Sequence, residues 1–243
     1  GTARLRSGAS RAFYTTMSAF PHAQYLLGAH EAHQFVPDEG AEVAFAGRSN
    51  SGKSSAINAV TQRHSLARTS RTPGQTQLVN FFELEPGRRL VDLPGYGYAK
   101  VPPKLRRHWE GLLARYFGER ESLRALFVIM DARHPLTEHD WRMIEYARAS
   151  DRGLHLVLTK ADKISRGAGM ATLAKVRREI GGGATAQLFS ALDKTGVDEA
   201  RRVLKQWLAA PKRSEASPSV PEPAQSRAAE ADSESKPSDT ALQ

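Results

Sequence analysis

The chain has 243 residues and a net charge of +9, with 40% hydrophobic and 25% charged residues. This composition supports one α/β domain with extensions, or at most two small domains. The lack of cysteine excludes disulfide frameworks, zinc–thiolate sites and cysteine nucleophiles, and it fits a cytoplasmic protein. We find neither a run of about 18 apolar residues nor the apolar core of a secretory signal, so we expect no membrane insertion.

Charge is distributed unevenly along the chain. Residues 1–210 carry a net charge of +11, whereas residues 211–243 carry −2. We expect so basic a body to bind a polyanion, nucleic acid rather than an anionic membrane surface. A general arginine bias of the proteome is the alternative. Residues 211–243 are rich in Ser, Pro and Ala and have no aromatic residue, so we expect a disordered tail.

The rest of the chain divides into an extension and a regular domain. Residues 1–40 form an N-terminal extension that we expect to be partly helical, with a short helix over 13–27. Strands and helices alternate within 41–210. In chain order we expect strand 42–46, helix 54–61, strands 77–84 and 89–92, helix 102–119, strand 126–130, helix 137–150, strand 154–158, helix 173–180, strand 187–190 and helix 196–208. This alternation predicts an α/β fold with a mostly parallel sheet and helices on both faces.

A phosphate-binding loop stands between the first strand and the first helix of this alternation. The pattern G-x-x-x-x-G-K-[ST] is matched by Gly47, Arg48, Ser49, Asn50, Ser51, Gly52, Lys53 and Ser54. Its glycines let backbone N–H groups surround phosphate oxygens. We expect Lys53 to reach the β- and γ-phosphates and the Ser54 hydroxyl to ligate Mg²⁺. The loop predicts the three-layer sandwich of a P-loop NTPase.

A second signal for phosphate follows the strand at 89–92. An Asp-x-x-Gly turn is formed by Asp92, Leu93, Pro94 and Gly95. A carboxylate at this point holds Mg²⁺ through water, and the Gly95 N–H senses a γ-phosphate. Such a turn is weak evidence alone, but its distance behind the P-loop makes it persuasive.

Two further strand ends indicate a guanine base. They carry Thr159, Lys160, Ala161 and Asp162, and then Phe189, Ser190 and Ala191. The Asp162 carboxylate accepts hydrogen bonds from the N1–H and the exocyclic amine of guanine, a donor pair that adenine lacks. We expect the Lys160 stem to cover the base plane and the Thr159 hydroxyl to tie its loop to the P-loop. The order of these signals predicts a site for GTP and GDP.

The chain resembles the EngB family of bacterial ribosome-assembly GTPases, which is related to the translation factors. The resemblance rests on GRSNSGKSS (47–55), TSRTPGQTQLVNFF (69–82), LVDLPGYGYAK (90–100), TKADK (159–163) and FSAL (189–192). It implies a GTPase that serves assembly of the large ribosomal subunit, in contact with its rRNA and proteins, and that normal cell division and septation require. It also implies nucleotide contacts from Gly74, Gln75, Thr76, Gln77 and Leu78. Thr76 would be the switch threonine that ligates Mg²⁺, with Thr72 as the competing candidate.

The predicted reaction is attack of water on the γ-phosphate of GTP, with Lys53 and Thr76 as catalytic residues. Tyr96 stands where Ras-like enzymes carry the glutamine that orients water. We therefore expect slow intrinsic hydrolysis, about 10⁻³ s⁻¹ or less. Asn50 is a candidate K⁺ ligand that would supply a positive charge; its alternative role is to shape the turn. The ribosomal particle is the other expected source of stimulation.

The helix at 102–119 is basic and also carries aromatic residues. Its bases are Lys104, Arg106, Arg107, His108 and Arg115, interleaved with Trp109 and Tyr116. We interpret it as a nucleotide-controlled RNA surface. The alternative is a solvated face whose aromatic residues fill the core. The eight histidines of the chain are scattered without metal-ligand spacing, so we assign them no role.

Two other functions stay open at this point. One is a nucleotide-dependent binding module of the division machinery whose hydrolysis is incidental. The other is an ATP-using P-loop enzyme, which Asp162 disfavours. We expect a monomer, because the sequence has no long heptad repeat.

Overall fold

The computed structural model describes residues 18–67, 78–95 and 102–210. The strands in these ranges are β1 (Gln24–Ala29), β2 (Ala41–Gly47), β3 (Val79–Glu85), β4 (Arg88–Asp92), β5 (Leu123–Asp131), β6 (Gly153–Thr159) and β7 (Ala184–Leu188). They form one sheet in the order β1-β3-β4-β2-β5-β6-β7. The pairs β1–β3 and β3–β4 are antiparallel and the other pairs are parallel. The predicted mostly parallel sheet is confirmed.

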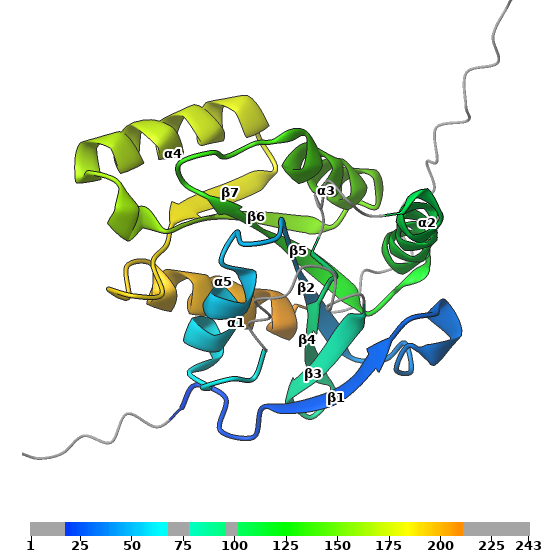
Figure 1. Ribbon diagram of the computed structural model, residues 1–243. Coiled ribbons are helices and arrows are strands. Elements are labelled where there is room, and N and C mark those ends of the chain that lie inside the picture. The colour runs from blue at the N-terminus through cyan, green and yellow to red at the C-terminus, as the bar shows by residue number, and fades with distance from the viewer. Residues whose placement is uncertain (1–17, 68–77, 96–101, 211–243) are drawn as a thin grey trace, which may run out of the picture. The chain divides into compact units, whose positions relative to one another are not determined.

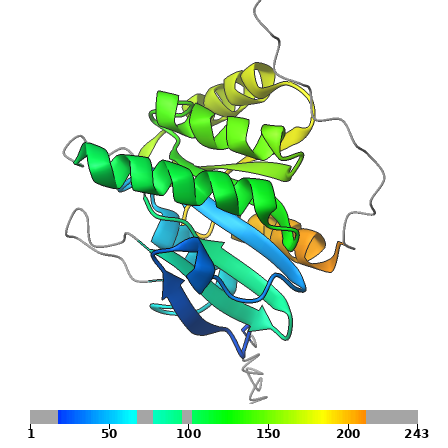
Figure 2. The same ribbon diagram turned by 90° about the vertical axis from the view of Figure 1, so that its right-hand side faces the viewer.

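Helices cover both faces of this sheet. The α-helices are α1 (Lys53–Thr61), α2 (Pro103–Glu119), α3 (Glu138–Ala149), α4 (Arg166–Ile180) and α5 (Val197–Ala209), and the short 3₁₀ helices are η1 (Ala32–Gln34) and η2 (Ala161–Lys163). One hydrophobic cluster joins the sheet to α1 and α5, and a second joins it to α2, α3 and α4 (Figures 1 and 2). The predicted three-layer sandwich is therefore confirmed.

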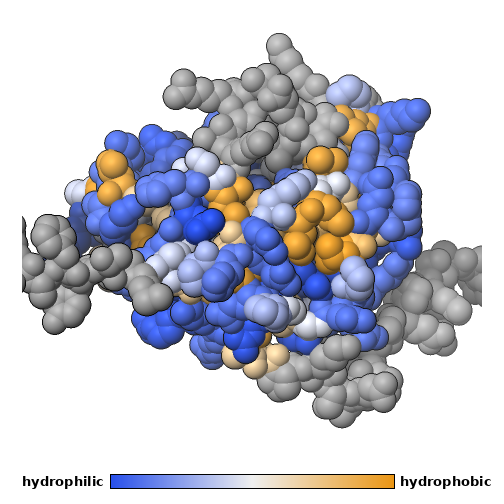
Figure 3. All heavy atoms as spheres, turned by 90° about the horizontal axis from the view of Figure 1, so that it is seen from below, coloured by the Kyte–Doolittle hydropathy of each residue, from blue (hydrophilic) through white to orange (hydrophobic). Residues whose placement is uncertain are grey.

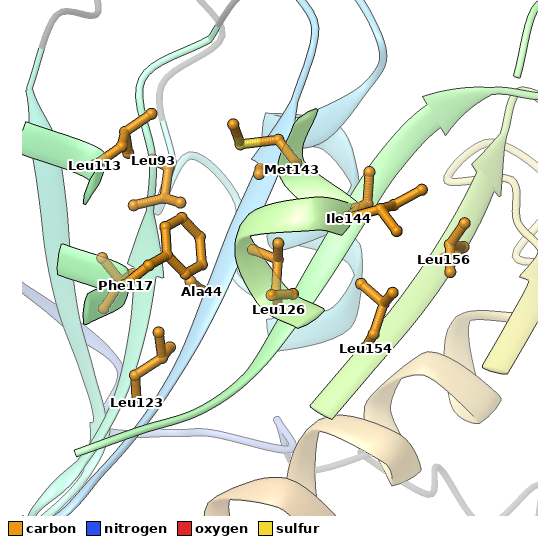
Figure 4. Packing of buried hydrophobic residues seen from close by; sticks show 14 of the residues in the cluster. Ala44, Leu93, Leu113, Phe117, Leu123, Leu126, Met143, Ile144, Leu154 and Leu156 are labelled. Atoms are coloured by element: carbon orange, nitrogen blue, oxygen red, sulfur yellow. The ribbon is translucent and has the colours of Figure 1, made fainter. Parts of the chain in front are cut away.

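The central strands are buried on both faces, because helices pack against each side of the sheet. This packing holds the ends of the strands in place. All positions of β5 are buried. Figure 4 shows side chains from helices and strands packed together, among them Phe117 of α2, Ile144 of α3 and Leu126 of β5. Burying one such side chain stabilises the fold by about 1.5–3 kcal/mol. The loops that follow the strands are thus held on a rigid base.

The N-terminal part of the sheet differs from the sequence prediction. Residues Gln24–Ala29 form β1, so the helix predicted over 13–27 is wrong there, and residues 13–17 lie outside the described ranges. β1 pairs with β3, which satisfies its backbone groups. Tyr25 also packs edge-on against Phe82, with ring centroids 5.6 Å apart. Long-range pairing overrides the local pattern here. The domain limits at 41 and 210 stay predictions.

Helix α4 begins earlier than the sequence prediction of 173–180. It starts at Arg166, after Ser165, whose side chain accepts a backbone N–H of the first turn at 3.3 Å. Gly167 and Gly169 lower the helix propensity of this turn, which hides its start in the sequence. The other predicted strands and helices are present, with ends shifted by a few residues.

A buried ionic cluster lies at the end of the sheet where β2 and β4 begin. Glu42 is fully buried and accepts hydrogen bonds from Arg89 Nε at 2.8 Å, Arg120 Nη2 at 2.6 Å and Tyr116 Oη at 3.2 Å. Arg89 and Arg120 also donate to the carbonyl of Pro37. Burial and the Glu42 carboxylate raise the pKa of Tyr116 well above its ordinary value. This Glu42 cluster joins the C-terminal half of α2 to the starts of two strands.

The side of the molecule that Figure 3 shows is mainly hydrophilic, with hydrophobic patches separated by polar residues. The large hydrophobic side chains that are exposed in the described ranges are Tyr25, Leu26, Met170 and Leu192. None of the helices in those ranges combines the length and hydropathy that crossing a lipid bilayer requires.

Candidate functional site

The predicted site residues gather at one edge of the sheet. β2 pairs in parallel with β4 and β5, and β5 with β6, so the carboxyl ends of these strands lie together. Phe45 stands opposite Asp92, and Asp131 stands opposite Thr159. Ligands of open α/β sheets bind at this edge. The topology thus brings together loops that are more than 100 residues apart in the chain.

The P-loop leads from the last residue of β2 into α1. A Cβ at Gly47 would lie 2.6 Å from the Ile129 carbonyl oxygen, so this position requires glycine. The loop reverses through positive φ angles of 61° at Asn50 and 93° at Gly52. The first backbone hydrogen bond of α1 runs from the Ala56 N–H to the Gly52 carbonyl at 2.8 Å. The positive end of α1 therefore faces the loop, which suits an anion.

Lys53 and Asp92 form an ion pair inside this site. Lys53 begins α1 and Asp92 ends β4, and only 8% and 4% of their surfaces are exposed. The Lys53 ammonium donates to Asp92 Oδ1. Burial raises the pKa of Asp92, and the nearby ammonium opposes that rise. Both charges thus stand where a phosphate and a cation can become their new partners.

The turn after β4 lies against the P-loop. A Cβ placed at Gly95 would be 3.8 Å from the Ser49 backbone nitrogen. The two predicted phosphate-binding segments therefore lie close together. Leu93 and Pro94 are buried, so their side chains shape the turn and do not face an open site.

The loop predicted to bind guanine is hydrogen-bonded to the P-loop. The Thr159 hydroxyl donates to the Ser51 carbonyl, which is the bond expected from the sequence. Lys160, with φ of 58°, donates from Nζ to the Asn50 carbonyl at 2.6 Å. These bonds hold the two loops at a fixed separation, as one ligand spanning both would require.

Asp162 is oriented by the end of the next strand. Its Oδ1 accepts a hydrogen bond from Ser190 Oγ at 2.8 Å, and its Oδ2 lies 3.3 Å from Lys163 Nζ. The Ser190 hydrogen bond, with that of Lys163, lowers the pKa of Asp162. The carboxylate is therefore ionised at neutral pH and acts as an acceptor. The Ala161 N–H donates to the Phe189 carbonyl at 3.1 Å, which ties the two loops together.

Asp131, at the end of β5, was missed in the sequence. It lies 3.0 Å from Lys160 Nζ and accepts hydrogen bonds from Arg133 Nε at 2.9 Å and Nη2 at 2.7 Å. These hydrogen bonds hold the pKa of Asp131 well below its usual range. A carboxylate at the end of a buried strand was the available signal. Asp131 fixes the position of the lysine that is expected to cover the base.

Some of the remaining predicted site residues lie within the described ranges, and the others lie outside them. Arg48, Ser54 and Ala191 are half-buried at the site edge, whereas the Phe189 side chain is buried in the core. Leu78 lies against Gly28 of β1. The residues outside the described ranges are Thr72, Gly74, Gln75, Thr76, Gln77 and Tyr96.

Known families identify the domain. Residues 42–160 match the 50S ribosome-binding GTPases. The probable GTP-binding protein EngB of Stenotrophomonas maltophilia (strain K279a) is 54% identical over 190 residues, which cover 76% of this chain and 95% of that protein. The chain belongs to the EngB family. A second member, from Xanthomonas campestris pv. campestris (strain 8004), is 54% identical over 192 residues, covering 76% and 92% of the two chains. As an EngB family member with this domain, the protein binds guanine nucleotides and is a GTPase.

Solved structures agree with this membership at the level of the fold. The crystal structure of a probable GTP-binding protein engB has a TM-score of 0.56 and 19% identity, covering 69% of this chain and 98% of that chain. The crystal structure of a variant of Aquifex aeolicus Era bound to GDP·AlF₄⁻ has a TM-score of 0.57 and 17% identity, covering 72% and 58%. Both likenesses support the α/β P-loop NTPase fold of the EngB chain.

Proposed function

We propose that this EngB family member is a GTP-controlled switch in the assembly of the large ribosomal subunit and that normal cell division requires it. The observation that carries the proposal is the Asp162 carboxylate, held by Ser190 in a loop bonded to the P-loop, in a domain whose helix α2 is basic. Relatives described as 50S ribosome-binding GTPases support the ribosomal partner. The protein would act in the cytoplasm as a monomer.

Each loop of the site has a role in this proposal. Asp162 would accept the N1–H and exocyclic amine of guanine, and Lys160 would cover the base. Lys53 would move from Asp92 to the β- and γ-phosphates. Ser54 and Thr76 would ligate Mg²⁺, with Asp92 holding it through water, because hydroxyl and carboxylate oxygens suit this ion. When bound, the ion neutralises charge on the phosphates.

Hydrolysis is expected to need assistance, since Tyr96 takes the place of a water-orienting glutamine. Asn50 is exposed at the P-loop tip with a positive φ, a position from which its side-chain oxygen would reach a K⁺ ion. The alternative is that Asn50 only shapes the turn. GTP turnover measured in K⁺ and in Na⁺ at equal ionic strength separates these roles: faster turnover in K⁺ supports the ligand role, and equal rates support the turn.

Helix α2 is the proposed ribosome-contacting element. Lys104, Arg106 and Arg107 are exposed and form no ion pair with any described residue. They are therefore available to RNA phosphates, whose counterions they would release. Trp109 and Tyr116 are 8% and 0% exposed, so the alternative interpretation of these aromatics as core residues holds, and base stacking is left out of the proposal.

Sedimentation with purified large ribosomal subunits tests the proposal. We expect binding with a non-hydrolysable GTP analogue, weaker binding with GDP, and a decline as salt rises. Lys104→Ala, Arg106→Ala and Arg107→Ala should each weaken binding, whereas Lys175→Ala in α4, the control that matches Lys104→Ala, should not. No sedimentation in either nucleotide state would contradict the ribosomal role, leave the GTPase standing and favour a division-linked binding module.

A further inference from the structure

Two histidines that are far apart in the sequence meet beside α2. His30 follows β1 and His108 lies in α2, 78 positions later. His108 Nε2 lies 2.9 Å from His30 Nδ1, and the two rings are nearly perpendicular with centroids 4.5 Å apart. Sequence spacing gives no sign of this pair, because only the folded sheet brings its members together.

Glu31 adds a carboxylate to the pair. Its Oε1 lies 4.0 Å from His108 Nδ1. One ligand atom from each of His30, Glu31 and His108 lies within 4.8 Å of the other two, an arrangement found for no other such trio in the described ranges. A tetrahedral zinc ion separates its nitrogen ligands by about 3.3 Å. His108 Nε2 and His30 Nδ1 are thus within a few tenths of an ångström of that spacing. His108 Nε2 also lies 2.9 Å from the His30 carbonyl oxygen, a contact that a bound ion would replace. Glu31, whose measured distance is to the other ring nitrogen of His108, is an exposed side chain that can turn toward Nε2.

The turn that carries two of these groups is already fixed. Gln34 Oε1 accepts the backbone N–H of His30 at 2.8 Å and that of Glu31 at 2.9 Å. The third group, His108, is held by a helix whose next residue, Trp109, is buried. Ligands on supported backbone lose little freedom when an ion binds, which favours affinity.

We propose that His30, Glu31 and His108 bind a divalent transition-metal ion, with Zn²⁺ as the natural occupant. Two imidazole nitrogens and one carboxylate oxygen are ligands that zinc prefers, and they leave one position for water. Mg²⁺ requires oxygen ligands in an octahedron, so it would not compete. The bound ion would link the turn after β1 to α2. The inference rests on the side-chain geometry and does not depend on the proposed function.

Zinc titration of the full chain tests the site. The protein is first stripped with a chelator, then dialysed and kept in excess Mg²⁺ at pH 7.5. Competition between the protein and a chromogenic zinc indicator gives the affinity of the protein for Zn²⁺. We expect His30→Gln and His108→Gln each to weaken zinc binding at least about tenfold. His33→Gln, an exposed histidine of the adjacent η1, is the matched control and should bind as the parent does.

Two further measurements distinguish loss of the metal site from a general loss of stability. Zinc should raise the melting temperature of the parent and of His33→Gln but not that of His108→Gln. Co²⁺ should give the absorption of a tetrahedral nitrogen–oxygen site in the parent and in His33→Gln, and not in His108→Gln. The proposal is overturned if the parent does not bind zinc, if His108→Gln binds it as tightly as the parent, or if His33→Gln loses it equally.

Discussion

Two buried groups of charged side chains stand at opposite ends of the sheet, and they differ in how many hydrogen-bond partners each carboxylate has. At the start of β2 and β4, Glu42 has hydrogen bonds from two guanidinium groups and a tyrosine hydroxyl. At the carboxyl ends, Asp92 is paired with Lys53, and its burial raises its pKa. The Glu42 cluster is therefore complete within the fold, whereas the Lys53–Asp92 pair is suited to exchange partners with a ligand. In this molecule the buried carboxylate with fewer partners is the one beside the P-loop.

The largest expected effect is on stability at the Glu42 cluster. Glu42→Gln leaves Arg89 and Arg120 buried without their carboxylate, so the free energy of unfolding should fall by about 3–5 kcal/mol. Urea unfolding measures it. Glu85→Gln, which removes an exposed pair with Arg88, should cost less than about 1 kcal/mol. GTP affinity of the folded protein should stay unchanged; a large loss of affinity in Glu42→Gln would break the contrast between the two ends.

The next effect is on catalysis at the Lys53–Asp92 pair. Lys53→Met should lower the single-turnover rate of GTP hydrolysis at least about 100-fold, because the substitution removes the ammonium that stabilises negative charge on the β- and γ-phosphates. Lys175→Met, in the exposed part of α4, is the control with the same change of side chain. Equal hydrolysis in the two variants would remove Lys53 from the proposed mechanism.

A smaller effect is expected where the guanine loop meets the P-loop. Thr159→Val deletes the hydroxyl that donates to the Ser51 carbonyl. Such a bond contributes about 1 kcal/mol, so GTP affinity should fall about fivefold. Calorimetric titration of GTP measures it, and Thr172→Val in α4 is the control. An unchanged affinity would mean that the two loops hold their places without this bond.

The smallest effect is expected on stability at Asp92. Because burial raises the pKa of this carboxyl, the folded chain binds a proton there more tightly than the unfolded chain does. The ionised form therefore opposes folding at neutral pH, and this cost falls as the pH is lowered toward the folded-state pKa. Asp92→Asn removes this cost but leaves the buried Lys53 ammonium with an amide in place of its carboxylate. Because the two effects oppose each other, the free energy of unfolding at pH 7 should change by no more than about 1 kcal/mol, as urea unfolding would measure. If the free energy of unfolding fell as much as in Glu42→Gln, the Lys53–Asp92 pair would stabilise the fold as the Glu42 cluster does.

The sequence predicted the parts of this protein that local pattern determines. Buried strands and the glycines of the P-loop follow from chain periodicity and backbone sterics, and both are present. β1 was missed because its extended conformation is stabilised by pairing with β3 rather than by a pattern in its own residues. Asp131 was missed because its partner Lys160 lies on a different strand end. The approach of His30 to His108 likewise exists only in three dimensions.

The attachment of α2 has a mechanical consequence. The helix spans Pro103–Glu119, about 25 Å, and its far end is held where Tyr116 and Arg120 bond to Glu42. If the helix pivoted about this attachment by about 10°, residues near Pro103, about 20 Å from Tyr116, would move by about 3 Å while Tyr116 hardly moved. Any displacement of α2 about this attachment would therefore be graded, greatest near Pro103 and smallest at the buried carboxylate.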